Sequence, residues 1–370
     1  MSGINSKTTN SNILVPKHNV FDLVGIENYA MFGELSILMT SAEQYMHRFG
    51  LIENLSKQGF FIKTKNNAAK IILGKEFEPS LYRGQNDGNK TLTPSFQREH
   101  LVNNDVNHCV EFIKREEFKF VFQETPYYKI LSKMQILGNN FEFDLDALAQ
   151  HYEFATNYLD VTKDIRVALF FAYTDCVNGN YFPIEDFDKY KPTLFVANFT
   201  SLTLNEDKLV AVGFQAASRP QVQSAMAINI TESPSEHNLY FRKVELTPSK
   251  DIAHGIFNSF NGGKSLFPEE PIKIIKNKIR EKMSLNKYLF SKYCRLYNKD
   301  KEKLKNELLK KYVIDESNIK IDEELYRKME DETTEVLIPW ILENISYRKV
   351  KLAQREDEHF YIDIYANSLK

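Results

Sequence analysis

The sequence predicts an α+β fold: a mixed or split β-sheet core flanked by helices, with a helical C-terminal extension. Two segments with helical spacing, 143–153 and 162–176, follow one another in the middle of the chain. Strand-like segments then gather at 192–199, 224–230 and 239–246, without the strand–helix alternation of a doubly wound sheet. Beyond residue 268 the pattern becomes charged and helical, which sets the C-terminal extension apart.

Composition places the chain among globular proteins, because 42% of its 370 residues are apolar and 26% are charged. A net charge of −2 disfavours nucleic acid as a partner. The first residues lack the apolar core of a signal peptide, and the longest apolar stretch, VALFFAY, is too short to span a membrane. We therefore expect a cytoplasmic protein without membrane association. The cysteines and histidines show no metal-ligand spacing, so we expect no metal.

The N-terminal part divides into two stretches. Residues 1–18 are polar and are expected to be flexible. Residues 19–75 are predicted to be an N-terminal helical segment, with a helix over roughly 30–58 that Gly59 would end. Strand character begins after that glycine and continues to residue 85.

The middle of the chain gives the clearest helix signals. Asp144 is a candidate N-cap, and the residues after it carry an apolar face at helical spacing. Thr162 is a candidate cap for the second helix, with Asp164 in its first turn. Residues 154–161 are either a linker between the two helices or a short strand leading into the second. Residues 281–370 are predicted to be a mainly helical extension that ends in the strand-like HFYIDIYA.

The stretch EPSLYRGQ, residues 78–85, carries the strongest site signal. Arg83 at a strand end offers a rigid set of donors suited to phosphate or carboxylate, and the alternative is a structural salt bridge. Gly84 would allow backbone or ligand to approach closely, and Gln85 would share the face of Arg83.

Further polar residues follow in ALAQHYEFATNYLDVT. His151 could act as a general acid or base, or simply interact with the end of its helix. Thr156, Asp160 and Thr162 could build an anion or ribose site at the next helix, or cap that helix. Arg219 and Gln223 precede the strand AMAINI, where Gln223 could orient an amide or a sugar hydroxyl or be a plain strand-end residue.

Three segments together, LYRGQ at 81–85, ALAQHYEFATNYLDVTKDIRVALFFA at 147–172 and RPQVQSAM at 219–226, resemble the FRG domain family. The resemblance covers roughly 76–280. It departs from the family pattern at Glu153, where glycine is usual, at Asn157, where arginine is usual, and at Val161, where tryptophan is usual. In chain order the site residues that it implies are Tyr82, Arg83, Gly84, Gln85, His151, Thr156, Asp160, Thr162, Arg219 and Gln223.

The Tyr-Arg-Gly strand end also looks like the first motif of arginine-type mono-ADP-ribosyltransferases, in which the arginine holds the dinucleotide phosphates. That similarity implies NAD as the cofactor. Gln221 and Gln223 lack the catalytic carboxylate of those enzymes, and Glu232 and Glu245 are not placed by any motif.

The two hypotheses are therefore an NAD-using, ADP-ribosyltransferase-like enzyme and a non-catalytic ligand-sensing or protein-interaction module. In the first, His151, Asp160 and Gln223 would be catalytic and the other site residues would bind the nucleotide-like ligand. The family resemblance implies a toxin or antiviral-defence setting. In the second, the C-terminal helices would engage a protein partner.

Overall fold

The computed structural model describes residues 59–63, 68–73, 80–136, 139–141, 143–198, 209–212, 216–230, 241–317, 319–339, 347–354 and 360–367. The expected flexible N-terminus and the helix over 30–58 lie outside these residues. The described part of the 19–75 segment is not helical. It forms strands β1 (Gly59–Lys63) and β2 (Ala68–Leu73), which agrees with the strand character expected after Gly59.

In the described part of the chain, six strands form an antiparallel sheet in the order β10-β11-β6-β3-β9-β12. The strands are β3 (Ser80–Gln85), β6 (Tyr158–Thr162), β9 (Thr193–Asn198), β10 (Leu209–Ala211), β11 (Ala225–Asn229) and β12 (Phe241–Glu245). The expected strands at 192–199, 224–230 and 239–246 are thus confirmed. Residues 158–162 are a strand rather than a linker.

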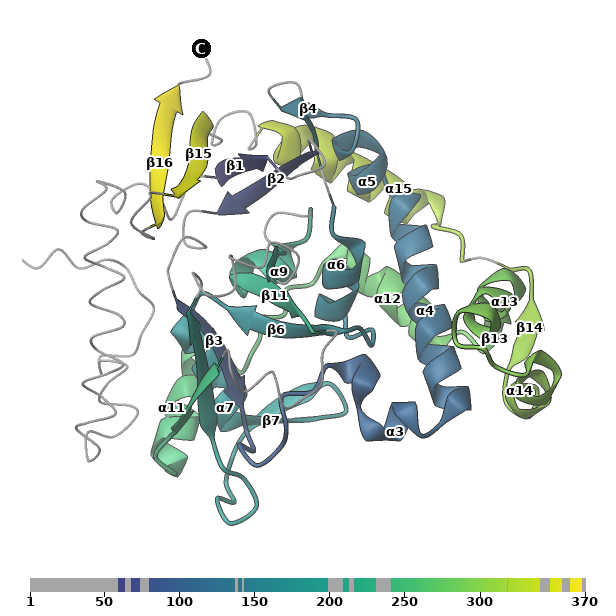
Figure 1. The fold of residues 1–370 in the computed structure, drawn as a ribbon, viewed down its shortest axis with the longest axis horizontal. Helices are drawn as coiled ribbons and strands as arrows, with labels where there is room; N and C mark the ends of the chain where they lie inside the picture. Colours follow the sequence, from purple (N-terminus) through teal and green to yellow (C-terminus); the bar gives the residue numbers. More distant parts are fainter. Residues whose placement is uncertain are drawn as a thin grey trace, which may run out of the picture.

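Alternation along these strands gives the sheet two apolar faces. Tyr82 packs with helix α7 (Ile165–Tyr173) and helix α11 (Lys250–Ser259) on one face. Its neighbour Leu81 packs with Val161 and Phe195 on the other. Figure 1 shows α7 and α11 beside β3. Helices and an antiparallel sheet around one core confirm the α+β class.

Helix α6 (Leu145–His151) begins where the sequence indicated, because the Asp144 side chain accepts a hydrogen bond from the Ala147 amide. Helix α7 begins two residues later than expected. Its N-cap is Asp164, which accepts from the Arg166 amide, so the assignment of Thr162 as the cap was wrong. Thr162 is the last residue of β6, and its hydroxyl accepts from the Asp164 amide at 2.9 Å.

Helix α4 (Asp105–Gln123) runs between the sheet domain and the C-terminal helices (Figure 1). Around it lie the segments α3 (Glu99–Val102), α5 (Pro126–Leu131), α12 (Pro271–Glu281), α13 (Lys287–Leu296), α14 (Lys301–Leu308) and α15 (Glu323–Asp331). Short helices η3 (Ser95–Gln97), α9 (Ser218–Val222) and η4 (Glu332–Leu337), the last a π-helix, complete the helical elements.

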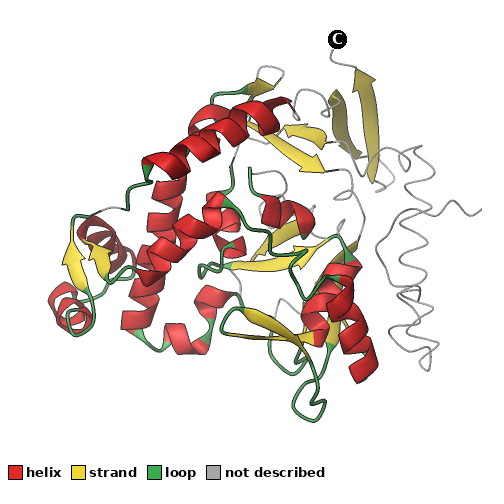
Figure 2. Cartoon of the chain, turned by 180° about the vertical axis from the view of Figure 1, so that it is seen from behind, coloured by secondary structure: helices red, strands yellow, loops and turns green. Residues whose placement is uncertain are grey.

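The remaining strands form small sheets, which Figure 2 draws in yellow with the strands of the main sheet. β1 and β2 join β4 (Gln135–Ile136) and β5 (Asn139–Phe141). The pairs are β7 (Thr174–Val177) with β8 (Asn180–Pro183), β13 (Ser284–Asn286) with β14 (Val313–Asp315), and β15 (Tyr347–Gln354) with β16 (Phe360–Asn367). The expected helical extension is confirmed in α13–α15, and its terminal strand is β16.

One apolar core joins the C-terminal extension to the rest of the chain. Residues of α4 such as Phe112 and Ile113 pack against Leu289, Phe290 and Tyr293 of α13. All five side chains are at most 3% exposed. The helical extension is therefore packed into the fold rather than attached through a linker.

Candidate functional site

The sheet splits between β3 and β6, and this split creates the site. β3 pairs with β9 at six positions but with β6 at a single position, Tyr82 opposite Thr162. Beyond that pair the side chain of Arg83 bridges the two strands, because its Nη1 donates to the main-chain oxygen of Asp160 at 2.7 Å. Among the described residues Arg83 therefore bonds to a carbonyl group rather than to a carboxylate, unlike the salt bridge considered from the sequence.

Gly84 is required where β3 meets helix α7. A Cβ atom on Gly84 would lie 1.6 Å from the carbonyl oxygen of Ala168 and 2.8 Å from the amide nitrogen of Ala172. Only a residue without a side chain permits this approach. The glycine of the Tyr-Arg-Gly motif thus allows β3 to pack closely against α7, and this contact fixes the position of the neighbouring arginine.

A cavity of about 500 Å³ lies in the split. Nine of the ten site residues expected from the sequence line it, namely Tyr82, Arg83, Gly84, Gln85, His151, Asp160, Thr162, Arg219 and Gln223. They come from β3, α6, β6 and α9, and Gln223 directly follows α9. These elements are far apart in sequence. The structure brings them together, while their roles stay predictions.

Thr156 is the exception, because it does not line the cavity. Its buried hydroxyl donates to Oε1 of Gln150 and accepts from the Tyr158 amide at 3.1 Å. Gln150 in turn donates through Nε2 to Oδ2 of Asp160 at 3.0 Å. Thr156 therefore orients Gln150, which orients the carboxylate of Asp160.

His151 lies beside that carboxylate. Its Nε2 is 3.6 Å from Oδ1 of Asp160. Burial lowers the pKa of His151, and the charge of Asp160 only partly opposes this effect. The imidazole is thus neutral near pH 7, which is the form that can accept a proton.

Four buried polar atoms around the cavity have no hydrogen-bond partner in the described structure. They are Nε of Arg83, Nε2 of His151, Oδ1 of Asp160 and Nε of Arg219. Buried polar atoms are nearly always paired in native proteins, so a group of four unpaired atoms at one cavity is unusual. Two cationic donors, one acceptor and one imidazole nitrogen therefore gather around this cavity.

Gln85, Thr162 and Gln223 support the walls. Gln85 donates to the carbonyls of Asp87 and Lys90, each at 3.0 Å, and so shapes the loop after β3. Thr162 donates to the carbonyl of Gln223 at 2.6 Å, and Gln223 donates to the carbonyl of Leu266 at 2.9 Å. These bonds tie α9 to the end of β6.

Arg219 is held by a residue that departs from the family pattern. Glu153 accepts from Nη1 of Arg219 at 3.2 Å and from Lys276 at 2.6 Å. Glu153 also adopts a left-handed backbone with φ of 68°, directly after the C-cap of α6. Glycine suits this conformation best, and in this chain the glutamate there binds Arg219 and Lys276.

Sequence reasoning missed several residues at the cavity. Arg98 lines it, is exposed, and has no ion pair or side-chain hydrogen bond among the described residues. Cys176 also lines it; it lies exposed on β7, and burial raises the pKa of its thiol, so it is not a ready nucleophile. The motif signalled Gln150, but nothing in the sequence signalled Arg98 or Cys176.

The described residues hold no group of three or more His, Cys, Asp or Glu side chains placed to share a metal ion. No helix among them has the length and apolarity that crossing a membrane requires.

Comparison with known families identifies one domain. Residues 78–180 match the family model described as the FRG domain. Comparison with curated proteins and with solved structures yields no match. The matched segment runs from β3 through α6, β6 and α7 to the start of β8, and therefore contains Arg83, His151 and Asp160, while Arg219 and Gln223 lie beyond it. The chain therefore contains an FRG domain at residues 78–180.

Proposed function

We propose that the cavity between β3 and β6 binds a nucleotide-like ligand that contains phosphate and ribose, with NAD as the first candidate. One observation carries the proposal: the unpaired, buried polar atoms of Arg83, His151, Asp160 and Arg219 meet in one cavity. A structural role alone would leave these atoms without compensation for their lost hydration.

The cationic side of the cavity suits a phosphate or pyrophosphate. Nη1 of Arg83 is anchored on β6, which leaves its Nε unpaired at the cavity. Arg219 presents a second unpaired Nε. Arg98 adds an exposed guanidinium without an ion pair among the described residues. Guanidinium groups are well suited to phosphate because their planar donors match its oxygens.

The acidic side suits a sugar. Oδ2 of Asp160 is occupied by Gln150, and its Oδ1 remains unpaired beside His151. A carboxylate oxygen held in this way can accept hydrogen bonds from ribose hydroxyls. A volume of about 500 Å³ falls within the range of about 300–1,000 Å³ that small-molecule sites occupy. The residues therefore fit a nucleotide in charge, donor set and size.

A catalytic version of this function rests on Asp160 and His151. NAD, when bound, would supply a labile bond between nicotinamide and ribose. Asp160 would stabilise positive charge that develops on the ribose. His151, neutral because burial lowers its pKa, would accept a proton from the attacking hydroxyl or water. In this version Asp160 provides the carboxylate that the sequence motifs lacked. An enzyme that consumes cellular NAD would suit a toxin or defence role.

The sensor version requires binding without turnover, and one experiment separates the two. Purified protein is titrated with NAD, ADP-ribose and nicotinamide mononucleotide while its melting temperature and binding heat are measured. Nicotinamide release is followed in the same samples by chromatography. We expect stabilisation by NAD or ADP-ribose. Release of nicotinamide that Asp160→Asn abolishes would identify the enzyme, and binding without release would identify the sensor.

Arg98→Ala is the variant of choice for the binding test, since Arg98 is exposed and its side chain bonds no other described residue. Loss of one charged hydrogen bond should weaken affinity about tenfold or more. Arg295→Ala removes an exposed arginine from α13, away from the cavity lining, and is the matched control. Absence of stabilisation by all three compounds would refute the proposed function.

A further inference from the structure

Four consecutive charged residues of helix α4, Lys114 to Glu117, are buried, which is unusual for lysine, arginine and glutamate. None of them lines the cavity. They lie where α4 runs between the six-stranded sheet and the C-terminal helices (Figure 1). Buried charges need partners, so the contacts of these residues show how the sheet and the C-terminal helices are connected.

Arg115 holds the helix that carries Gln150 and His151. Its Nη1 donates to the carbonyl of Ala155 at 3.2 Å, just beyond the end of α6. Its Nε lies 3.7 Å from Oδ1 of Asp146, in the first turn of α6. One guanidinium thus contacts the segment on both sides of the cavity residues. A helix of seven residues is too short to be stable by itself, so its position depends on such external contacts.

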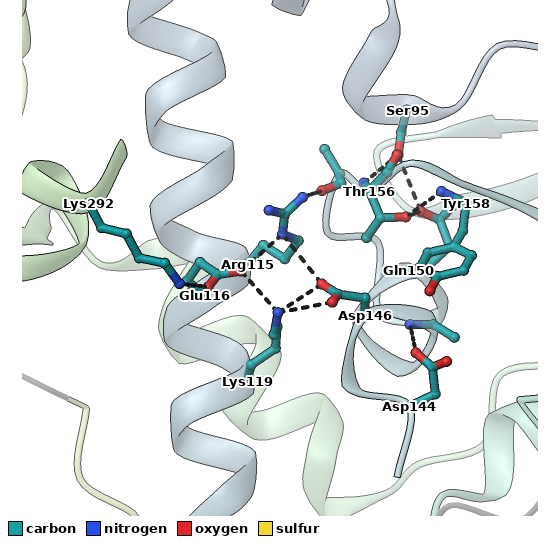
Figure 3. A network of polar contacts seen from close by, with 12 residues as sticks. Ser95, Arg115, Glu116, Lys119, Asp144, Asp146, Gln150, Thr156, Tyr158 and Lys292 are labelled. Atoms are coloured by element: carbon teal, nitrogen blue, oxygen red, sulfur yellow. Dashed lines mark hydrogen bonds and ion pairs between the residues drawn. The ribbon is translucent and has the colours of Figure 1, made fainter. Parts of the chain in front are cut away.

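The charges around Arg115 form one network, which Figure 3 shows. Lys119 donates to Oδ1 and Oδ2 of Asp146, each at 3.0 Å, and to Oε1 of Glu116 at 3.1 Å. Lys292 of α13 donates to Oε2 of Glu116 at 2.6 Å. Nε of Arg115 also lies 3.4 Å from Oε1 of Glu116. Three cations therefore serve two carboxylates, and the third cation comes from the C-terminal extension.

The two carboxylates compete for Lys119 and Arg115. The side chain of Glu116 is 8% exposed and that of Asp146 is 40% exposed. Water can compensate Asp146 but reaches Glu116 poorly, so Glu116 has the stronger need for cations. Burial would raise the pKa of Glu116, yet the hydrogen bond from Lys292 and the charges of Lys119 and Arg115 bring it below its ordinary value. Removing Lys292 would draw the other two cations from Asp146 towards Glu116.

We propose that Arg115 is a positioning residue for the cavity, and that Lys292 on the C-terminal extension controls how firmly Arg115 and Lys119 hold α6. The proposal rests on the function proposed above as far as ligand binding is concerned. The positioning role itself needs no ligand, because it states only that the C-terminal extension sets the position of Gln150 and His151 through shared ion pairs. Anything that draws Lys292 away from Glu116 then loosens the acidic side of the cavity.

The test compares Lys292→Met with Lys287→Met in the full-length chain. Lys287 lies on the same helix, but its ion pair at 3.2 Å is with exposed Glu316 rather than with α4. Two readouts need no ligand. Amide hydrogen exchange follows residues 145–156, and NMR titration follows the His151 ring, assigned with His151→Gln. The third readout is the affinity for NAD and ADP-ribose.

In Lys292→Met we expect exchange in 145–156 to accelerate about fivefold or more, the range of a modest coupling between sites. The pKa of His151 should rise towards its ordinary value, since water then reaches the ring more easily. Lys287→Met should leave both unchanged. In an Asp146→Asn background the effect of Lys292→Met should largely disappear, because the carboxylate that Lys119 and Arg115 would release is already absent.

The outcomes separate this inference from the proposed function. If exchange and the His151 pKa change but no nucleotide binds to any variant, the positioning role stands and the proposed ligand is wrong. If wild-type protein binds NAD or ADP-ribose and Lys292→Met matches it in all three readouts, the positioning role is refuted. Equal effects from Lys287→Met would also overturn it, because they would show general loosening of α13.

Discussion

The contact between Gly84 and helix α7 allows a prediction with a magnitude. In Gly84→Ala the new methyl group would lie 1.6 Å from the carbonyl oxygen of Ala168. Ordinary contact requires about 3.5 Å, so strand and helix must separate by on the order of 2 Å. Helix α7 buries seven of its nine residues, including Phe170 and Tyr173, and they would lose packing on the sheet.

Overpacking of a core commonly costs about 1–3 kcal/mol, and the close approach to rigid backbone places Gly84→Ala at the upper end, about 3 kcal/mol. That change corresponds to a drop in melting temperature of about 6–12 °C for a large domain. Thermal and urea denaturation measure it. Gly179→Ala is the control, because open space surrounds that position and only its φ of 79° opposes a side chain, at about 1–2 kcal/mol. A Gly84→Ala protein as stable as Gly179→Ala would refute the reasoning.

Three further predictions concern stability. A chain that ends at Glu281 loses Leu289 and Phe290 from the core shared by α4 and α13, and buried Glu116 loses Lys292. We expect this truncated chain to be insoluble or molten. A cooperative melting transition would show that the remaining chain folds without that core. Because burial lowers the pKa of His151, the unfolded chain takes up a proton below about pH 6.5 that the folded chain refuses. Stability should therefore fall from about pH 6.5 to 5, less steeply in His151→Asn; identical slopes in urea titrations would exclude a buried neutral imidazole. Thr156→Val leaves the Tyr158 amide without its acceptor and removes the shorter of two hydrogen bonds to Oε1 of Gln150, which keeps the bond from Ser95 at 3.3 Å. We expect a cost of about 1–3 kcal/mol, whereas a change below about 0.5 kcal/mol would show that water replaces the hydroxyl.

Local patterns determined the elements. The cap at Asp144, the apolar spacing of α6 and α7 and the composition of β9, β11 and β12 depend on residues close in sequence, so they could be predicted without a fold. The position of Thr162 could not be predicted from nearby residues, because its hydroxyl bonds to Gln223, which lies 61 residues away. The choice between strand and linker at 158–162 was also decided at long range, by pairing with β11.

By itself the sequence predicted nine of the residues that line the cavity, because the motif residues stand in a recognisable order. Only the tertiary structure decided which contacts each one makes. It assigned Gly84 to a helix contact, made Thr156 a support rather than a wall, and brought exposed Arg98 to the cavity. It also joined the C-terminal helices to α6 through Glu116 and Lys292, which are 176 residues apart. The physical reason is that burial and charge pairing depend on neighbours in space, and sequence spacing specifies only neighbours along the chain.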